Sequence, residues 1–151
     1  MIKCEFENGN KASLRHLVVH AIVIKENKIL LEKRASHLLE GGKWALPGGF
    51  VDRDETAEEA TLRELREETG WTGKVLQLLR INTNPNRPHE DRQNIALDYI
   101  VEPIEQVGVG DQEVSDLEWF SLDNLPTADN LAFDHKESIE LYLAYSNSKL
   151  K

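Results

Sequence analysis

Glutamates give this chain its clearest potential for chemistry. Residues 49–71 read GFVDRDETAEEATLRELREETGW and contain six of them. On a helical wheel of about 100° per residue, Glu64, Glu67 and Glu68 fall on one side of a helix, beside the apolar stripe and the small residue Ala60. Because small residues allow another stretch of backbone to approach closely, these three carboxylates can converge on one confined point.

A hard divalent cation is the partner that such a cluster needs. Carboxylates one turn apart repel one another, and burying them without a counter-charge is costly. Mg²⁺ prefers oxygen ligands in octahedral geometry and keeps water and substrate phosphates in its shell. Arg63 stands four residues before Glu67 and can pair with it, which would hold its rotamer. The residues alone favour a metal site over the alternative, a solvated and salt-bridged helix face.

The helix that carries these glutamates has recognisable ends. Asp54 or Thr56 can cap its start, the pattern predicts helix as far as Thr69, and Gly70 is its stop. The preceding segment, residues 36–50, holds four glycines and a proline. It is therefore predicted to be mostly loop, with a short strand at 44–46.

β-Branched residues predict the strands that surround this loop and helix. Residues 15–25 and 28–35 would form a hairpin around a turn at Glu26 and Asn27. Further strands are predicted at 73–83, 93–102 and 114–120, with a polar loop at 83–92 and a final helix at about 134–146. This order indicates a mixed sheet with helices packed on it, an α/β or α+β sandwich.

The composition limits the partners and the compartment. The 151 residues fit one domain, with 40% hydrophobic and 30% charged residues. A formal net charge of −9 without a basic patch argues against DNA or an anionic membrane as partner. The apolar runs are too short to cross a bilayer, and no signal-peptide core follows the first residues. The single cysteine, Cys4, fits a reducing compartment, so the cytoplasm is the predicted location.

The glutamate-rich stretch resembles the Nudix box, G-x5-E-x7-R-E-U-x-E-E-x-G-U, in which U is a bulky apolar residue. The residues that match it are Gly49, Glu55, Arg63, Glu64, Leu65, Glu67, Glu68 and Gly70. Trp71 stands where the family usually has an aliphatic residue, a departure that concerns packing rather than chemistry. The segments KWALPGGFVD, LEWFSLDNLP and LAFDH also resemble Nudix segments, so the likeness covers most of residues 15–145.

The resemblance implies a fold and a metal site. The fold would be one Nudix hydrolase domain over residues 1–151, an α/β/α sandwich with a mixed β-sheet. Mg²⁺ would be the cofactor, with Mn²⁺ as a substitute. The metal ligands would be the Gly49 carbonyl and the side chains of Glu64, Glu67, Glu68 and, from a later loop, Glu113.

Catalytic roles follow from the same resemblance. One of Glu64, Glu68 and Glu113 would act as the base on water, and which of them does so stays open. Glu113 also has the simpler interpretation of a surface charge. Arg63 would hold the glutamates in place, and Glu55 would orient the loop and the start of the helix.

The reaction implied is attack of water on one phosphorus of a diphosphate, assisted by bound metal. KWALPGGFVD, TNPNRP, LAFDH and Pro85 look most like the group that cleaves ADP-ribose and other nucleoside diphosphate sugars. ADP-ribose would give AMP and ribose 5-phosphate. Against this group, the chain is too short for the extended N-terminal sheet domain of many dimeric members. The alternative substrates are nucleoside triphosphates or oxidised dNTPs.

Candidate substrate contacts lie outside the box. Arg34 ends the second predicted strand, and Arg80, Asn84 and Arg87 lie near the loop at 83–92. Arginine can bind phosphate bidentately, although a solvated surface arginine is the competing interpretation for each.

Two other classes of function share features with the predicted hydrolase of nucleoside diphosphate sugars. An RNA 5′-pyrophosphohydrolase uses the same chemistry, but its polyanionic substrate favours a basic surface, and the sequence pI is about 5.0. A non-enzymatic ADP-ribose sensor would need a DNA-binding domain, for which no residues remain. The expected partner is therefore a small nucleotide, and the resemblance also suggests a homodimer.

Overall fold

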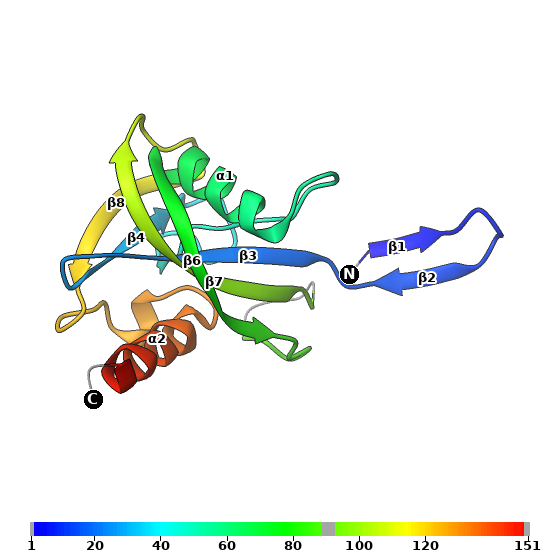
Figure 1. Cartoon of the computed structure of the whole chain (residues 1–151). Helices are drawn as coiled ribbons and strands as arrows, with labels where there is room; N and C mark the ends of the chain where they lie inside the picture. Colours follow the sequence, from blue (N-terminus) through cyan, green and yellow to red (C-terminus); the bar gives the residue numbers. More distant parts are fainter. Residues whose placement is uncertain (1, 89–92, 150–151) are drawn as a thin grey trace.

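The computed structural model describes residues 2–88 and 93–149 (Figure 1). Residues 89–92, the end of the predicted polar loop, lie outside the described residues. In chain order the elements are β1 (Ile2–Glu5), β2 (Lys11–Leu14), β3 (Leu17–Lys25), β4 (Lys28–Arg34), β5 (Trp44–Ala45), α1 (Ala57–Thr69), β6 (Trp71–Asn82), β7 (Ile95–Gln106), β8 (Val114–Ser121), the short 3₁₀ helix η1 (Ala128–Asn130) and α2 (His135–Lys149).

The predicted hairpin is formed by β3 and β4. Glu26 and Asn27 both have positive φ, 50° and 60°, as a two-residue turn that follows the twist of the strands requires. Next to this turn the antiparallel register pairs Lys25 with Lys28. The turn therefore fixes which β4 residues face α1.

A mixed sheet runs through the molecule in the order β5-β4-β3-β7-β6, with β8 paired to the other edge of β4. β3 and β7 are parallel, from Leu17 opposite Ile95 to Val23 opposite Val101. The remaining pairs in this sheet are antiparallel. This mixed sheet confirms the predicted fold class.

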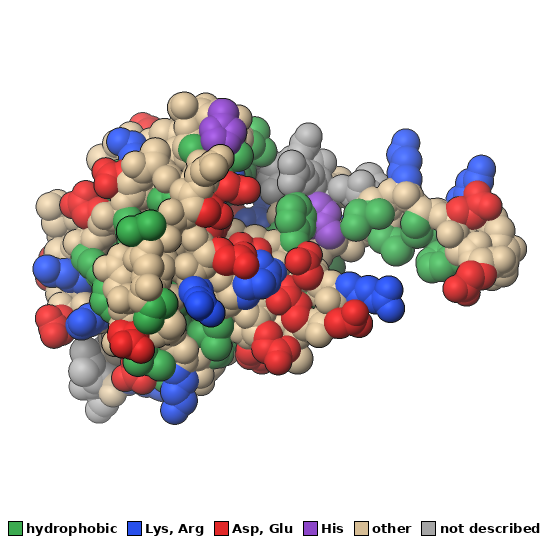
Figure 2. All heavy atoms as spheres, turned by 90° about the horizontal axis from the view of Figure 1, so that it is seen from above, with side chains coloured by type: hydrophobic (Ala, Val, Ile, Leu, Met, Phe, Trp, Pro, Cys, Tyr) green, Lys and Arg blue, Asp and Glu red, His purple; other side chains and the backbone are tan. Residues whose placement is uncertain are grey.

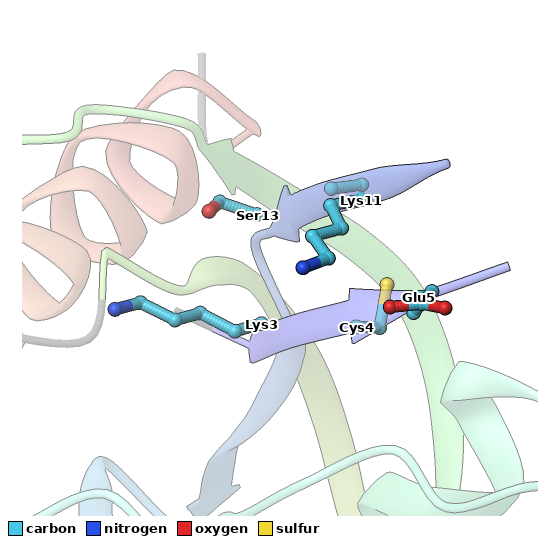
Figure 3. A pocket seen from close by; sticks show the side chains of 6 residues that line it. Lys3, Cys4, Glu5, Lys11 and Ser13 are labelled. Carbon is cyan, nitrogen blue, oxygen red and sulfur yellow. The ribbon is translucent and has the colours of Figure 1, made fainter. Parts of the chain in front are cut away.

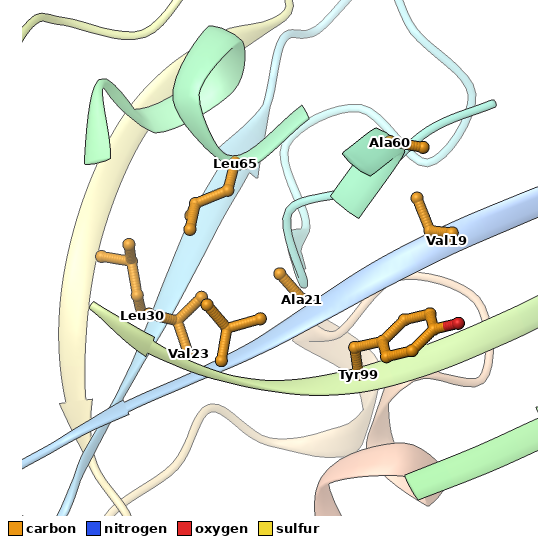
Figure 4. Packing of buried hydrophobic residues seen from close by; sticks show 8 residues of the cluster. Val19, Ala21, Val23, Leu30, Ala60, Leu65 and Tyr99 are labelled. Atoms are coloured by element: carbon orange, nitrogen blue, oxygen red, sulfur yellow. The ribbon is translucent and has the colours of Figure 1, made fainter. Parts of the chain in front are cut away.

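Hydrophobic side chains fill both faces of the sheet. On one face, Val19, Ala21 and Val23 of β3 pack with Ala60 and Leu65 of α1 (Figure 4). On the other face, Ile22 of β3 belongs to a second cluster that includes Ile139 of α2. Both faces of β3 are buried, which explains its nearly continuous apolar sequence.

The β1–β2 hairpin is the element that the sequence interpretation missed. It forms a separate two-stranded sheet that projects from the sandwich (Figure 1). Its strands have only four residues each, although apolar and polar residues alternate in both, with Ile2 opposite Leu14 and Cys4 opposite Ala12. The overlooked signal is the pair Asn8-Gly9, because Gly9 has φ 80° and Asn-Gly favours a hairpin turn.

Other differences concern element ends. β6 begins two residues before the predicted strand, β7 continues to Gln106, and α2 extends to Lys149. η1 was not predicted. Within the described ranges, no helix is long and apolar enough to cross a membrane.

Candidate active site

Helix α1 carries the glutamates, and both of its ends are capped. The Thr56 hydroxyl accepts a hydrogen bond from the Glu59 amide at 3.2 Å, and the Glu59 carboxylate accepts one from the Thr56 amide at 2.8 Å. This capping box makes Thr56, rather than Asp54, the N-cap. Gly70 ends the helix with φ 71°, and its amide donates to the Arg66 carbonyl.

The glycine loop before α1 lies directly against the glutamate face. The Gly48 amide donates to Glu68 Oε2 at 2.7 Å. A Cβ atom at Gly49 would clash with the end of the Glu64 side chain, so a larger residue here would displace the Glu64 carboxylate. The Gly49 carbonyl accepts from the Val19 amide at 2.9 Å, which anchors the loop to β3. The predicted close approach of backbone to the helix is thus present.

Arg63 connects the acidic side chains on the outer part of this face. Its NH1 group donates to Glu64 Oε1 at 2.9 Å and to Glu67 Oε2 at 3.0 Å. Its Nε and NH2 groups donate to the two oxygens of Glu55 at 3.0 and 2.7 Å. NH2 also donates to the Phe50 carbonyl at 3.0 Å. These hydrogen bonds from Arg63 lower the pKa of Glu55.

Deeper in the site, carboxylates are buried close to one another. Burial raises the pKa of Glu64, although the adjacent Arg63 acts in the opposite direction. Burial raises the pKa of Glu68 well above its usual range, and the charge of Glu32 adds to this rise. Glu32 lies on β4 and was not predicted as a site residue. Its signal was a lone acid directly after the apolar residues of KILLEKR.

The donor set fits a hard divalent cation, because every side-chain donor is a carboxylate oxygen. As the side chains stand, no three His, Cys, Asp or Glu residues in the described part of the chain form a metal-holding group. Arg63 engages Glu64 and Glu67, and the Gly48 amide engages Glu68. A buried set of like charges is nevertheless what a divalent cation would neutralise.

The predicted residue from the later loop lies beside this cluster. The charge of Glu113 contributes to the raised pKa of Glu64. The Glu113 carbonyl accepts from the Ala35 amide at 2.7 Å, and its amide donates to Asp111 Oδ1 at 2.8 Å. The Asp111 amide donates to the Glu67 carbonyl at 3.1 Å. The loop is thereby attached to the end of α1.

Arg34 lies at the end of β4, as predicted, and is half-buried. Its Nε donates to the Leu39 carbonyl at 2.9 Å, and its guanidinium carbon lies 5.3 Å from the centre of the Phe133 ring. The charge of Arg34 acts on Glu32. This places Arg34 next to the acidic cluster, and its contact with a substrate phosphate stays a prediction.

Arg80, in contrast, makes its contacts with α2. It donates to Glu137 at 2.7 Å and to the Ser138 hydroxyl at 3.1 Å. Both partners belong to this chain, so the structure gives Arg80 an intramolecular role. Its substrate-binding role stays a prediction.

Arg87 and Asn84 have different surroundings. Arg87 is only 6% exposed and donates two hydrogen bonds from Nε and one from NH2 to the Asp134 carboxylate, with NH1 bonded to Asn94. Asn84 is exposed, and its side chain accepts from the Asn86 amide at 2.9 Å. Substrate contact by either residue stays a prediction, and for Arg87 it would require a rearrangement of a buried ion pair.

A buried polar network on the α2 side of the sheet was not predicted. His20 Nδ1 lies 2.8 Å from Asp98 Oδ1, and the Ser138 hydroxyl donates to Asp98 Oδ2 at 2.6 Å. His135 Nδ1 accepts from the Leu46 amide at 3.0 Å. These contacts join residues that lie 40 to 89 positions apart in the sequence. The sequence indicated them only through His20, a polar residue inside the apolar strand β3.

Acidic side chains gather on the face seen in Figure 2, which looks down on α1. The hairpin has a hollow of its own, about 420 Å³ in volume, lined by residues that include Lys3, Cys4 and Lys11 (Figure 3). That hollow lies on β1 and β2, away from the glutamates. The acidic face is therefore the candidate active site.

Known proteins resemble this chain in sequence. The NUDIX domain family matches residues 14–142. An ADP-ribose pyrophosphatase of Methanocaldococcus jannaschii is 41% identical over 132 residues, which are 87% of this chain and 75% of that protein. A CTP pyrophosphohydrolase of Escherichia coli is 45% identical over 58 residues, 38% of this chain and 43% of that protein.

Solved structures resemble the fold. An ADP-ribose pyrophosphatase from Streptococcus suis has a TM-score of 0.72 and 25% identity, covering 88% of this chain and 92% of that one. A bifunctional NMN adenylyltransferase/ADP-ribose pyrophosphatase from Francisella tularensis, in complex with AMP and a manganese ion, has a TM-score of 0.65 and 25% identity. It covers 87% of this chain and 42% of that one.

Proposed function

The chain belongs to the NUDIX family and is a pyrophosphatase of that family, and from this premise we propose that it hydrolyses ADP-ribose or a related nucleoside diphosphate sugar with Mg²⁺. Mn²⁺ is the proposed substitute, and a relative's structure contains that ion. The products from ADP-ribose are AMP and ribose 5-phosphate. One domain over residues 1–151 carries this activity in the proposal.

The observation that carries the substrate proposal is the 41% identity to an ADP-ribose pyrophosphatase over most of both chains. The intact acidic face of α1 supports the hydrolytic part. Gly48 and Gly49 bring loop backbone against Glu68 and Glu64, so the donors needed for metal and diphosphate lie together.

Each residue of this face has a task in the proposed reaction. Glu64, Glu67 and Glu68 would hold the divalent cation, which would supply charge neutralisation for the phosphates and activation of a water molecule. Arg63 keeps Glu64 and Glu67 oriented. Arg34 binds a phosphate oxygen through its guanidinium.

The bond changes follow the in-line pattern of phosphoryl transfer. The oxygen of water bonds to one phosphorus while that phosphorus loses its bond to the bridging oxygen. The water proton passes to a carboxylate, for which Glu64, Glu68 and Glu113 are the candidates. The bridging oxygen leaves with the second phosphate.

A substrate panel tests the proposal. Purified protein with Mg²⁺ would be incubated with ADP-ribose, GDP-mannose, UDP-glucose, dGTP, 8-oxo-dGTP and triphosphorylated RNA, and the products separated by chromatography. Glu67→Gln and Glu68→Gln should abolish turnover, whereas Glu118→Gln, an exposed change on β8, should not. Release of a nucleoside monophosphate and a sugar phosphate supports the proposal. Pyrophosphate release from triphosphates alone would contradict it.

The E. coli CTP pyrophosphohydrolase similarity favours one second candidate, hydrolysis of nucleoside triphosphates, including oxidised dNTPs. The mechanism on α1 would be the same, because both reactions break a pyrophosphate bond. The substrate panel separates the two, since only triphosphates release pyrophosphate. An RNA 5′-pyrophosphohydrolase would act on the RNA, and an ADP-ribose sensor would bind ADP-ribose without turnover.

We further propose a homodimer for the whole protein, with β1 and β2 at the contact. Ile2, Phe6 and Leu14 of this hairpin are each 43 to 51% exposed. An isolated two-stranded hairpin is marginally stable in water, so a covering partner would stabilise it.

A cytoplasmic location is also part of the proposed function, and it rests on the single cysteine.

A further inference from the structure

Glu32 is a buried acid that the Nudix box does not include. It lies in β4 with strands on both sides, opposite Ala45 of β5 and opposite Leu117 of β8. Only 1% of its surface is exposed. Two paired neighbours hold its backbone firmly, so its carboxylate position is as well defined as that of a core residue.

The side chain of Glu32 points toward α1. Leu30 packs in the cluster beneath α1 and Leu31 in the cluster beneath α2, so strand alternation places Glu32 on the α1 face. There its carboxyl group contacts that of Glu68. The charges of Glu64 and Asp111 also act on it.

One oxygen of Glu32 is unsatisfied. Oε2 is buried and has no hydrogen-bond partner in the described structure. Burial raises the pKa of Glu32 to about 8, and neither the side-chain hydrogen bond with Glu68 nor the nearby charge of Arg34 offsets this rise. A buried carboxyl group with one oxygen unpaired is costly, and a hydrophobic residue would fill the same place at lower cost. Structural need therefore does not explain an acid at this position.

We propose that Glu32 is an additional carboxylate ligand of the divalent cation, reaching the site from the sheet while Glu68 reaches it from α1. The inference rests on the proposed function, because it takes the metal site of that function as given. Glu32 would contact the cation from the buried side of the site, whereas Glu64 and Glu67 would contact it from the side nearer the solvent. A cation there would meet the unsatisfied Oε2 atom and balance the charge of both carboxylates.

Metal binding to the full-length protein tests this directly. Mn²⁺ affinity would be measured by isothermal titration calorimetry and by the electron paramagnetic resonance signal of free Mn²⁺. The variants are Glu32→Gln, which keeps the shape, Glu32→Val, which suits a buried strand, and the exposed control Glu118→Gln. We expect both Glu32 variants to bind Mn²⁺ about 10- to 100-fold more weakly and the control to bind normally.

Thermal unfolding supplies a second readout that a purely structural role would not produce. Without metal, Glu32→Val should melt at or above the temperature of the unmodified protein, because an unsatisfied buried acid is gone. With Mn²⁺ it should gain less stability than the unmodified protein, because bound ligand stabilises in proportion to affinity. A purely structural role would instead lower the metal-free melting temperature and leave the gain unchanged.

The outcomes separate this inference from the proposed function. Unchanged Mn²⁺ affinity in both Glu32 variants, with nucleotide-sugar hydrolysis intact in the unmodified protein, overturns the Glu32 role alone. An unmodified protein that neither binds Mn²⁺ nor hydrolyses any nucleotide overturns both.

Discussion

At the scale of single residues, Arg63 has the most connections in the candidate site, because its guanidinium reaches Glu55, Glu64 and Glu67. A lysine keeps the charge but offers one ammonium group instead of a planar fork. Arg63→Lys should therefore lower kcat about 10- to 100-fold, with a smaller change in KM.

Steady-state kinetics with ADP-ribose would measure this. Arg66→Lys, an exposed change on the same helix, is the control. Equal losses in both variants would contradict a specific role for the planar guanidinium of Arg63.

His135 is a single residue that makes the stability of the folded protein depend on pH. Burial lowers its pKa well below 6.5, and the charges of His20, Arg87, Arg34 and Arg80 act in the same direction. Below about pH 6.5 the His135 side chain binds a proton in the unfolded chain but stays neutral in the folded chain. The contribution of His135 to the free energy of unfolding is therefore complete above about pH 6.5. It decreases as the pH falls, by up to about 1.4 kcal/mol per pH unit.

Urea unfolding between pH 7.5 and pH 5 would test the effect of His135. His135→Gln retains an acceptor for the Leu46 amide but cannot be protonated, so its stability should fall less steeply with acid. Identical slopes for the variant and the unmodified protein would contradict the assignment to His135.

Residue-level prediction relied on local evidence. Glu64, Glu67 and Glu68 share a helix, so their common face follows from the helical period alone. Glu32 meets Glu68 across 36 positions, through strand pairing that no local pattern reveals. Likewise, no local pattern reveals the ion pair of Arg87 with Asp134, 47 residues away, and phosphate contact by Arg87 stays a prediction.

At the scale of elements, the contact between the glycine loop and α1 is the feature that creates the site. Gly49→Ala would place a methyl group against the Glu64 carboxylate. We expect this change to displace the Glu64 carboxylate and to weaken Mn²⁺ binding about tenfold or more, since orientation of ligands sets metal affinity.

Calorimetric titration with Mn²⁺ would measure the change. Gly108→Ala is the matched control, because a Cβ there meets nothing closer than 3.9 Å. If Gly49→Ala bound Mn²⁺ as well as Gly108→Ala does, close backbone approach would not be a requirement of the site.

The elements themselves followed from the sequence where packing made their pattern strong. α1 has a capping box and a glycine stop, and β3 is apolar on both faces, so their positions were predicted closely. β1 and β2 pack against little besides each other, so no buried alternation marks them. Their signals were the turn at Gly9 and a short apolar alternation in each strand.

At the scale of the whole molecule, the chain divides into a sandwich with a two-sided core and a hairpin that projects from it (Figure 1). The candidate active site belongs entirely to the sandwich, between β4, the glycine loop and α1. Changes on the hairpin should therefore affect assembly without affecting the metal site.

The proposed homodimer gives a test at this scale. Phe6 and Leu14 are exposed on the hairpin, where Figure 2 shows hydrophobic side chains gathered along one side. Replacing both by aspartate introduces charge into the proposed contact, and like charges facing each other across it oppose association. We expect the double variant to be monomeric under conditions in which the unmodified protein is dimeric.

Light scattering coupled to size-exclusion chromatography would report the mass of each species over a range of concentrations. Leu141→Asp, at a residue of α2 that is 41% exposed, controls for the effect of adding charge to an exposed apolar position. The double variant should retain the Mn²⁺ affinity of the unmodified protein, because the hairpin contributes none of the proposed ligands. A monomeric unmodified protein at all concentrations would refute the dimer, and dissociation by Leu141→Asp alone would move the contact to α2.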